Sequence, residues 1–149
     1  MKHALAKALA ASSLAVATIA GTAMPASAAA SGVQAAGCPS SGYPTPGNPG
    51  VSCTSLSNGA VFHGKYHPDA SRTRTYTKYT KTGGSTISAK LGYIYKGNYK
   101  WSPYYSIASG TSKTYSWNTL DYDFWCATTV GVMSVSGGTS YQTPISRCQ

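Results

Sequence analysis

Glutamate is absent from this sequence, and aspartate occurs only at Asp69, Asp121 and Asp123. Glycoside hydrolases generally use two carboxyl groups, one as an acid and one as a base or nucleophile. Asp121 and Asp123 stand two residues apart, among aromatic neighbours, and would share one face of a strand. In a strongly basic chain, two such aspartates are more often ordinary surface charges. We therefore predict no catalytic carboxylate pair.

Several motifs that carry chemistry are also missing. There is no G-x-S-x-G nucleophile motif, no glycine-rich phosphate loop leading into a helix, and no C-x2-C metal spacing. After residue 28 there is no helical periodicity and no apolar run long enough to span a membrane. These absences favour a binding protein over an enzyme, and we predict no catalytic residue, no cofactor and no bound metal.

The first 28 residues have the pattern of a secretory signal peptide. Lys2 and Lys7 make the start positively charged, an uncharged apolar run covers residues 8–20, and a small-x-small pattern ends at Ala28. We predict cleavage after Ala28, a secreted, extracellular product, and no transmembrane segment in the mature chain.

The mature chain is strongly basic. Removing Lys2 and Lys7 from the 12 basic residues leaves ten against three acidic ones, a net charge of +7. This charge favours anionic partners such as cell-wall polymers, phospholipid head groups or nucleic acid. The basic residues are spread along the chain rather than gathered in one run, which weakens the argument for nucleic acid.

All four cysteines fall in the predicted mature chain, at Cys38, Cys53, Cys126 and Cys148. An even number of cysteines in a small exported protein indicates disulfides. Of the three pairings that four cysteines allow, we favour Cys38–Cys53 with Cys126–Cys148, because each closes a local loop. A disulfide over a loop of this size contributes about 3 kcal/mol to stability.

Composition divides the mature chain into an arm and a domain. Residues 29–52 are rich in proline, glycine and serine, which suits a disordered or irregular arm. Residues 53–149 contain short alternating segments separated by glycine-rich turns. We therefore predict an all-β domain, a small antiparallel β-sandwich or barrel with two disulfides, which we expect to be monomeric.

The clearest local pattern is a β-hairpin at residues 86–107. Apolar and aromatic residues occupy every second position, at Ile87, Ala89, Leu91, Tyr93 and Tyr95. A two-residue loop at 97–98 and a three-residue loop at 96–98 both fit the turn composition. We favour the three-residue loop, which pairs Tyr95 with Tyr99. It also pairs Tyr93 with Trp101, so that the aromatic residues gather on one face towards the core.

Residues 72–81 also alternate and predict a strand. One face carries the densest basic patch, Arg72, Arg74 and Lys78, together with Tyr76, and the other carries three threonines and Tyr79. Because neither face is strongly apolar, we expect this strand to lie near the edge of a sheet, where basic side chains discourage strand addition.

The mature chain has two histidines, His63 and His67. With Asp69 they could offer three metal ligands, although a strand would hold the two histidines about 13 Å apart. The same pair could act as acid and base in RNA cleavage, with Arg72, Arg74 or Lys65 holding phosphate. Neither arrangement matches a fixed motif, and we favour partly exposed polar residues near a turn.

Our main hypothesis is a secreted, non-enzymatic domain that binds an anionic or glycan surface such as the cell wall. Basic side chains attract the polymer, and exposed aromatic rings can stack on sugars. The candidate ligand-binding residues are Arg72, Arg74, Lys78, Tyr99, Trp101, Tyr104 and Tyr105. Two alternatives are a secreted antimicrobial, bacteriocin-like protein and a small secreted ribonuclease that uses His63 and His67.

Overall fold

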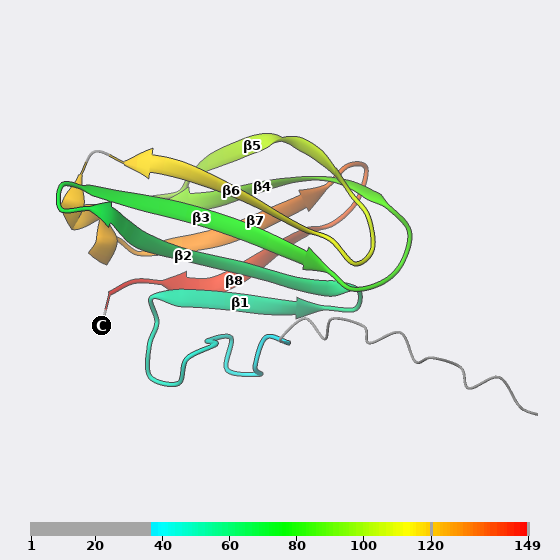
Figure 1. Cartoon of the computed structure of the whole chain (residues 1–149), viewed down its shortest axis with the longest axis horizontal. Coiled ribbons are helices and arrows are strands. Elements are labelled where there is room, and N and C mark those ends of the chain that lie inside the picture. Colours follow the sequence, from blue (N-terminus) through cyan, green and yellow to red (C-terminus); the bar gives the residue numbers. More distant parts are fainter. Residues whose placement is uncertain (1–36, 120, 149) are drawn as a thin grey trace, which may run out of the picture.

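The computed structural model describes residues 37–119 and 121–148, which form two antiparallel four-stranded sheets packed face to face (Figure 1). The first sheet has the order β1 (Val51–Leu56), β2 (Gly59–Asp69), β3 (Arg72–Lys81), β6 (Ser112–Thr119). The second has the order β5 (Asn98–Ile107), β4 (Ile87–Tyr95), β7 (Thr129–Val135), β8 (Ser140–Ser146). The predicted all-β sandwich is confirmed, whereas the predicted signal peptide lies outside the described residues.

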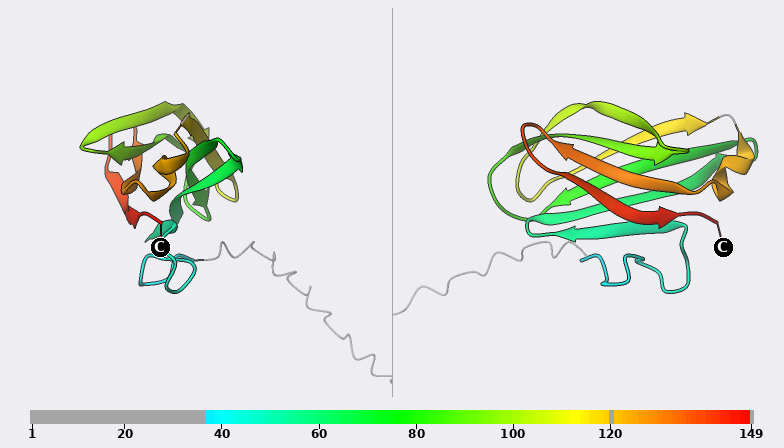
Figure 2. Two further views of the ribbon diagram at one scale, coloured as in Figure 1. Left: turned by 90° about the vertical axis from the view of Figure 1, so that its left-hand side faces the viewer. Right: turned by 180° about the vertical axis from the view of Figure 1, so that it is seen from behind.

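The chain crosses between the sheets three times: from β3 to β4, from β5 to β6, and from β6 to β7. The last crossing contains a short 3-10 helix, η1 (Tyr122–Cys126), which lies across one end of the sandwich (Figure 2). On one side the edge strands β1 and β8 lie next to each other, joined by a hydrogen bond from Ser52 Oγ to Thr143 Oγ1 (3.0 Å). The edge strands β5 and β6 make fewer contacts on the opposite side.

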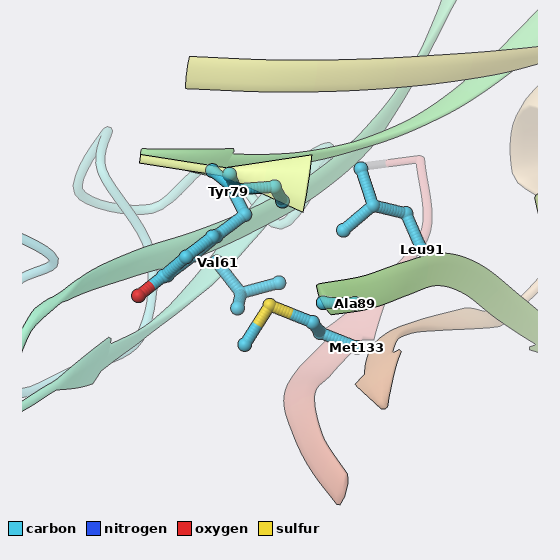
Figure 3. Packing of buried hydrophobic residues seen from close by; sticks show 6 residues of the cluster. Val61, Tyr79, Ala89, Leu91 and Met133 are labelled. Carbon is cyan, nitrogen blue, oxygen red and sulfur yellow. The ribbon is translucent and has the colours of Figure 1, made fainter. Parts of the chain in front are cut away.

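One half of the interior is apolar. Side chains from both sheets interdigitate there, and Val61, Tyr79, Ala89, Leu91 and Met133 are at most 2 % exposed (Figure 3). The alternating positions that the sequence assigned to the core face of β4 include Ala89 and Leu91, and this part of the prediction is confirmed. Burial of such side chains is the main stabilising contribution in a domain of this size.

The other half of the interior is polar. In this half the inward-facing residues of β3 are threonines, and they are buried together with a histidine and a lysine from β2: Thr73, Thr75, Thr77, His63 and Lys65. β3 lies between β2 and β6, so the expectation that this strand is near an edge was wrong. Threonine is compatible with a central strand here because most of these hydroxyl groups have hydrogen-bond partners.

Both predicted disulfides are present, Cys38–Cys53 and Cys126–Cys148. The first ties the irregular segment 37–50 to β1, which begins at Val51, inside the range expected for the arm. Backbone hydrogen bonds also hold this segment, from Cys53 N to Gly42 O (2.7 Å) and from Arg147 N to Pro49 O (3.1 Å). The described part of the arm is therefore attached along β1 and the end of β8.

The β4–β5 hairpin has a different register from the predicted one. Its turn is formed by residues 96–97, whose φ angles of 48° and 75° suit a two-residue type I′ turn. Tyr95 therefore pairs with Asn98. This one-residue difference moves Tyr99 and Trp101 from the core face to the solvent face of the sheet. The predicted three-residue loop was wrong because it was chosen to place Tyr99 and Trp101 on the same face as the apolar residues of β4.

Candidate functional site

Apart from Tyr105, the predicted ligand-binding residues lie on two opposite surfaces. Face A is the solvent side of the first sheet and carries Tyr66, Arg74, Tyr76 and Lys78. Face B is the solvent side of the second sheet and carries Lys90, Tyr99, Trp101 and Tyr104. The sheets pack against each other through their inner sides, so the basic patch of β3 and the aromatic residues of β5 do not form one site.

Face B is built around a glycine. Gly92 on β4 pairs with Trp101 on β5, and a Cβ atom at Gly92 would lie only 2.6 Å from Cε3 of that indole. The ring therefore covers the bare backbone of Gly92. Glycine in a strand commonly marks such a close approach, and an aromatic partner restores the missing packing.

A β-bulge brings a third aromatic residue to face B. Trp101 and Tyr104 are three residues apart and would point to opposite sides of a regular strand. The pairing between β5 and β4 shifts by one residue at this point: Gly92 pairs with Trp101, whereas Lys90, two residues earlier on β4, pairs with Tyr104. Within the shift, Ser102 turns inward and its Oγ accepts a hydrogen bond from Leu91 N (2.9 Å). The bulge therefore places both rings on the solvent side.

Lys90 completes a row of side chains along face B. Its Nζ lies 4.5 Å from the centroid of the Trp101 ring and 5.4 Å from that of Tyr104. The rings of Tyr99 and Trp101 are almost parallel, at 12°, with centroids 5.6 Å apart. Tyr99 and Tyr104 are 52 % and 51 % exposed. The row therefore combines open aromatic surface with one ammonium group.

Sequence reasoning did not select Lys90 as a site residue. The alternation of β4 places Lys90 on the solvent side, but only the correct turn and the bulge bring the aromatic rings beside it. The pair Ser102-Pro103 was the available signal for the bulge, because proline inside a strand is mainly found at edges and irregularities. Tyr105 points the other way, towards Tyr115 and Lys113, and is half-buried.

Face A also combines a basic side chain with aromatic rings. Arg74 donates a hydrogen bond from Nε to Asn118 Oδ1 (2.8 Å), and its guanidinium carbon lies 5.9 Å from the centroid of the Tyr66 ring. The rings of Tyr66 and Tyr76 are 6.1 Å apart. Lys78 lies on the same side of β3, because Thr77 and Tyr79 are both buried.

Arg72 differs from the other predicted basic residues because an aspartate neutralises it. Its Nη2 lies 2.6 Å from Asp69 Oδ2, and its Nε donates a second hydrogen bond to the same oxygen. These bonds hold the pKa of the Asp69 carboxyl well below its usual range and raise the pKa of Arg72. This exposed pair fixes the turn between β2 and β3, and Arg72 is less available to an anionic ligand than Arg74.

The two histidines are in different environments. His63 has no exposed surface, so it cannot touch a polymer outside the protein. His67 lies at the end of the sandwich, where its ring stacks on Tyr122 with centroids 4.0 Å apart and lies near Trp125. An acid–base pair for RNA cleavage would need both side chains accessible to one phosphate. The burial of His63 argues against that mechanism.

The aspartates do not form a reactive pair either. Asp121 precedes η1 and accepts a hydrogen bond from Asp123 N through Oδ1 (2.9 Å), which is the usual role of an N-cap residue. Both residues are exposed. Within residues 37–119 and 121–148, no three of the His, Cys, Asp and Glu side chains are grouped so that they could hold a metal ion.

A continuous chain of hydrogen bonds crosses the polar half of the interior. Lys65 Nζ donates to Thr129 Oγ1 (2.9 Å), which is 2.8 Å from His63 Nε2. The His63 Nδ1 atom is 3.0 Å from Thr77 Oγ1, and that hydroxyl donates to Gly92 O (2.7 Å). Because the Thr77 proton is used on Gly92 O, His63 donates through Nδ1, and Nε2 of the neutral ring is then the acceptor. This arrangement suits a neutral imidazole.

Burial and the nearby charge of Lys65 lower the pKa of His63 from 6.5 to about 3. Between these values the unfolded chain binds a proton that the folded protein does not, so stability falls as the pH falls. We expect a loss of about 3 kcal/mol between pH 7 and pH 4, measured by urea unfolding. The His63→Gln variant should lose this pH dependence, whereas His67→Gln should keep it. An NMR titration that showed a protonated His63 imidazole in the folded protein at pH 5 would contradict the prediction.

Within the described part of the chain there is no helix long and apolar enough to cross a membrane. No protein-family model, curated protein or solved structure matches the chain. The geometry of the two faces is therefore the basis on which function is inferred.

Proposed function

We propose that the protein is a secreted, non-enzymatic binding domain that attaches to glycan chains of a cell-wall surface. The observation that supports this most is the row of Tyr99, Trp101, Lys90 and Tyr104 on face B. Aromatic rings provide apolar surface for the C–H faces of sugars, and tyrosine hydroxyl groups tolerate water beside them. A row along a strand suits an extended polymer better than a small molecule in a closed pocket.

The charge distribution supports an anionic glycan. None of the four strands of the second sheet contains a carboxylate, and the β4–β5 hairpin contributes Lys90, Lys96 and Lys100. Asp121 and Asp123 precede or lie within η1, at the end of the sandwich. A negatively charged polymer would therefore meet no like charge along face B.

A sedimentation assay with purified cell walls and with chitin tests the proposal. The disulfide-bonded protein should be retained at low salt, and Trp101→Ala should weaken wall binding by about tenfold or more, because truncating a tryptophan at the centre of a binding surface commonly costs about 2 kcal/mol. Tyr99→Ala should have a smaller effect in the same direction. Added salt should weaken binding without removing the contribution of the rings.

Two matched controls come from the end of the sandwich. Trp125→Ala removes the same side chain as Trp101→Ala, and Tyr122→Ala removes a tyrosine that is 47 % exposed, much like Tyr99. Neither control residue lies on face A or face B, and both variants should bind walls like the wild type. Absence of wall and chitin retention at low salt, or equal losses for Trp101→Ala and Trp125→Ala in folded protein, would refute the proposal.

A further inference from the structure

The two faces repeat the same chemistry on opposite sides of the molecule. On face B, Lys90 lies over Trp101 and next to Tyr104. On face A, Arg74 lies over Tyr66, which is 39 % exposed and packs against Tyr76. These residues come from different sheets, whose inner sides are occupied by the core. Each face therefore offers a basic group beside open aromatic surface.

Charge complementarity applies to both faces. The first sheet contains a single carboxylate, Asp69 at the end of β2, and this group is paired with Arg72. No oxygen atom of the described residues accepts a hydrogen bond from the Nζ of Lys78 or Lys90, so both ammonium groups keep their donors available to a ligand. An anionic group on a bound polymer could meet these donors directly.

The geometry prevents one short segment of polymer from occupying both faces. Two sheets packed face to face are about 10 Å apart, and the faces lie outside this layer. A single chain would have to bend around an edge strand to reach the second face. Two separate polymer chains can lie on the two faces without bending.

We propose that the domain is bivalent for anionic polysaccharide, one chain on each face, and that it cross-bridges polymer chains. This inference rests on the proposed function, since it assigns to face A the same ligand class as to face B. Sugar rings stack on Trp101 and Tyr104 on one side and on Tyr66 and Tyr76 on the other. The carboxylate groups of the polymer pair with Lys90 and with Arg74 or Lys78.

Bivalence is tested with alginate, a carboxylated polysaccharide, at two chain lengths. Isothermal titration with a short alginate oligosaccharide should give two bound chains per protein and a clear solution. Long alginate should give light scattering that rises and then falls as protein is added, because excess protein occupies the chains singly. Dextran, a neutral polysaccharide, should give neither strong binding nor scattering.

Variants of each face separate bridging from simple binding. Tyr66→Ala/Arg74→Ala alters face A, and Lys90→Ala/Trp101→Ala alters face B. Each should reduce the stoichiometry from two to one and abolish scattering with long alginate, while the remaining face keeps its affinity within about threefold. The combined variant should bind no alginate. A thermal unfolding curve for each variant shows that it is folded.

The double variant Tyr122→Ala/Arg147→Ala is a matched control. It removes one exposed tyrosine and one exposed basic residue that lie outside both faces. It should keep two sites and full scattering, which shows that a general loss of positive charge is not the cause.

The outcomes distinguish this inference from the proposed function. One oligosaccharide per wild-type protein, with wall binding intact, would overturn bivalence and leave the wall-binding proposal standing. If the protein bound neither cell walls nor alginate, both the proposed function and the inference of bivalence would be refuted. Two sites that prefer single-stranded polyuridylate to alginate would overturn the assignment to polysaccharide.

Discussion

Gly131→Ala is expected to lower the free energy of unfolding by about 3 kcal/mol or more, which is a large share of the stability of a small domain. Gly131 on β7 faces His63 on β2 across the sandwich. An added methyl group would lie 2.2 Å from His63 Cβ and 2.7 Å from its Cγ. A Cβ atom is attached to the backbone and cannot rotate away. The variant must therefore separate the two sheets.

Separating the sheets would also disturb the hydrogen bonds of the polar interior. Gly131 N donates to Thr143 Oγ1 (3.0 Å), and His63 bonds to hydroxyl groups on both sheets. Gly138→Ala is the matched control, because a Cβ atom there would come no closer than 3.6 Å to any neighbour. Urea unfolding should show Gly138→Ala within about 0.5 kcal/mol of the wild type. A Gly131→Ala variant equally close to the wild type would contradict the packing described here.

Lys65→Ala is expected to cost about 4 kcal/mol of stability. Lys65 is 3 % exposed, and its Nζ donates to Ala127 O (2.8 Å), Thr129 Oγ1 (2.9 Å) and Ser146 O (2.9 Å). The substitution leaves buried oxygen atoms without a donor and opens a cavity where the aliphatic part of the side chain lay. Lys65→Met fills most of that space and removes the buried charge. We therefore expect a smaller loss for Lys65→Met.

The two variants should also differ from the wild type in alkali. Burial lowers the pKa of Lys65 from 10.5 to about 8. Between these values the unfolded chain holds a proton that the folded protein has released, so stability rises with pH. We expect the wild type to gain about 2 kcal/mol relative to Lys65→Met between pH 7 and pH 9.5.

The free energy of unfolding of the two proteins is measured by urea unfolding up to pH 9.5, because buried tyrosines begin to contribute above that pH. Burial raises the pKa of Tyr79 and Tyr93, and these tyrosines destabilise the folded state once the unfolded chain begins to lose their protons. Taking the difference between wild type and Lys65→Met removes contributions that both proteins share. Parallel pH profiles for the two proteins would show that Lys65 is not a source of this dependence.

Local alternation in the sequence predicted the inward face of β4 and the outward basic face of β3, because each strand has one buried side. The disulfide pairing followed from loop length. The register of the β4–β5 hairpin could not be predicted from the sequence. The choice between a two-residue and a three-residue loop depended on whether Tyr99 and Trp101 belong to the core, and composition does not distinguish a buried aromatic residue from an exposed one. The bulge at Ser102 was missed for a related reason: its effect depends on pairing with β4.

The polar interior was the other feature that the sequence did not reveal. Thr73, Thr75 and Thr77 have the pattern of a half-exposed strand, yet all three are fully buried. His63 and Lys65 suggested a surface site, yet their partners are hydroxyl and carbonyl groups from β3, β7 and β8. Burial of such groups is favourable when hydrogen-bond partners are present, and all of these side chains except the Thr75 hydroxyl have one among the described residues. Those partners are distant in sequence, so pattern analysis does not bring them together.

The interruption of β5 has a consequence for association between molecules. β5 is the outermost strand of its sheet, and an unpaired strand edge can recruit the same strand of a second molecule. Pro103 has no amide hydrogen to offer, and the adjoining bulge breaks the regular spacing that a newcomer would have to match. Pro103 and the bulge therefore oppose the pairing of β5 with the same strand of a second molecule, which is the first step towards ribbons and fibrils.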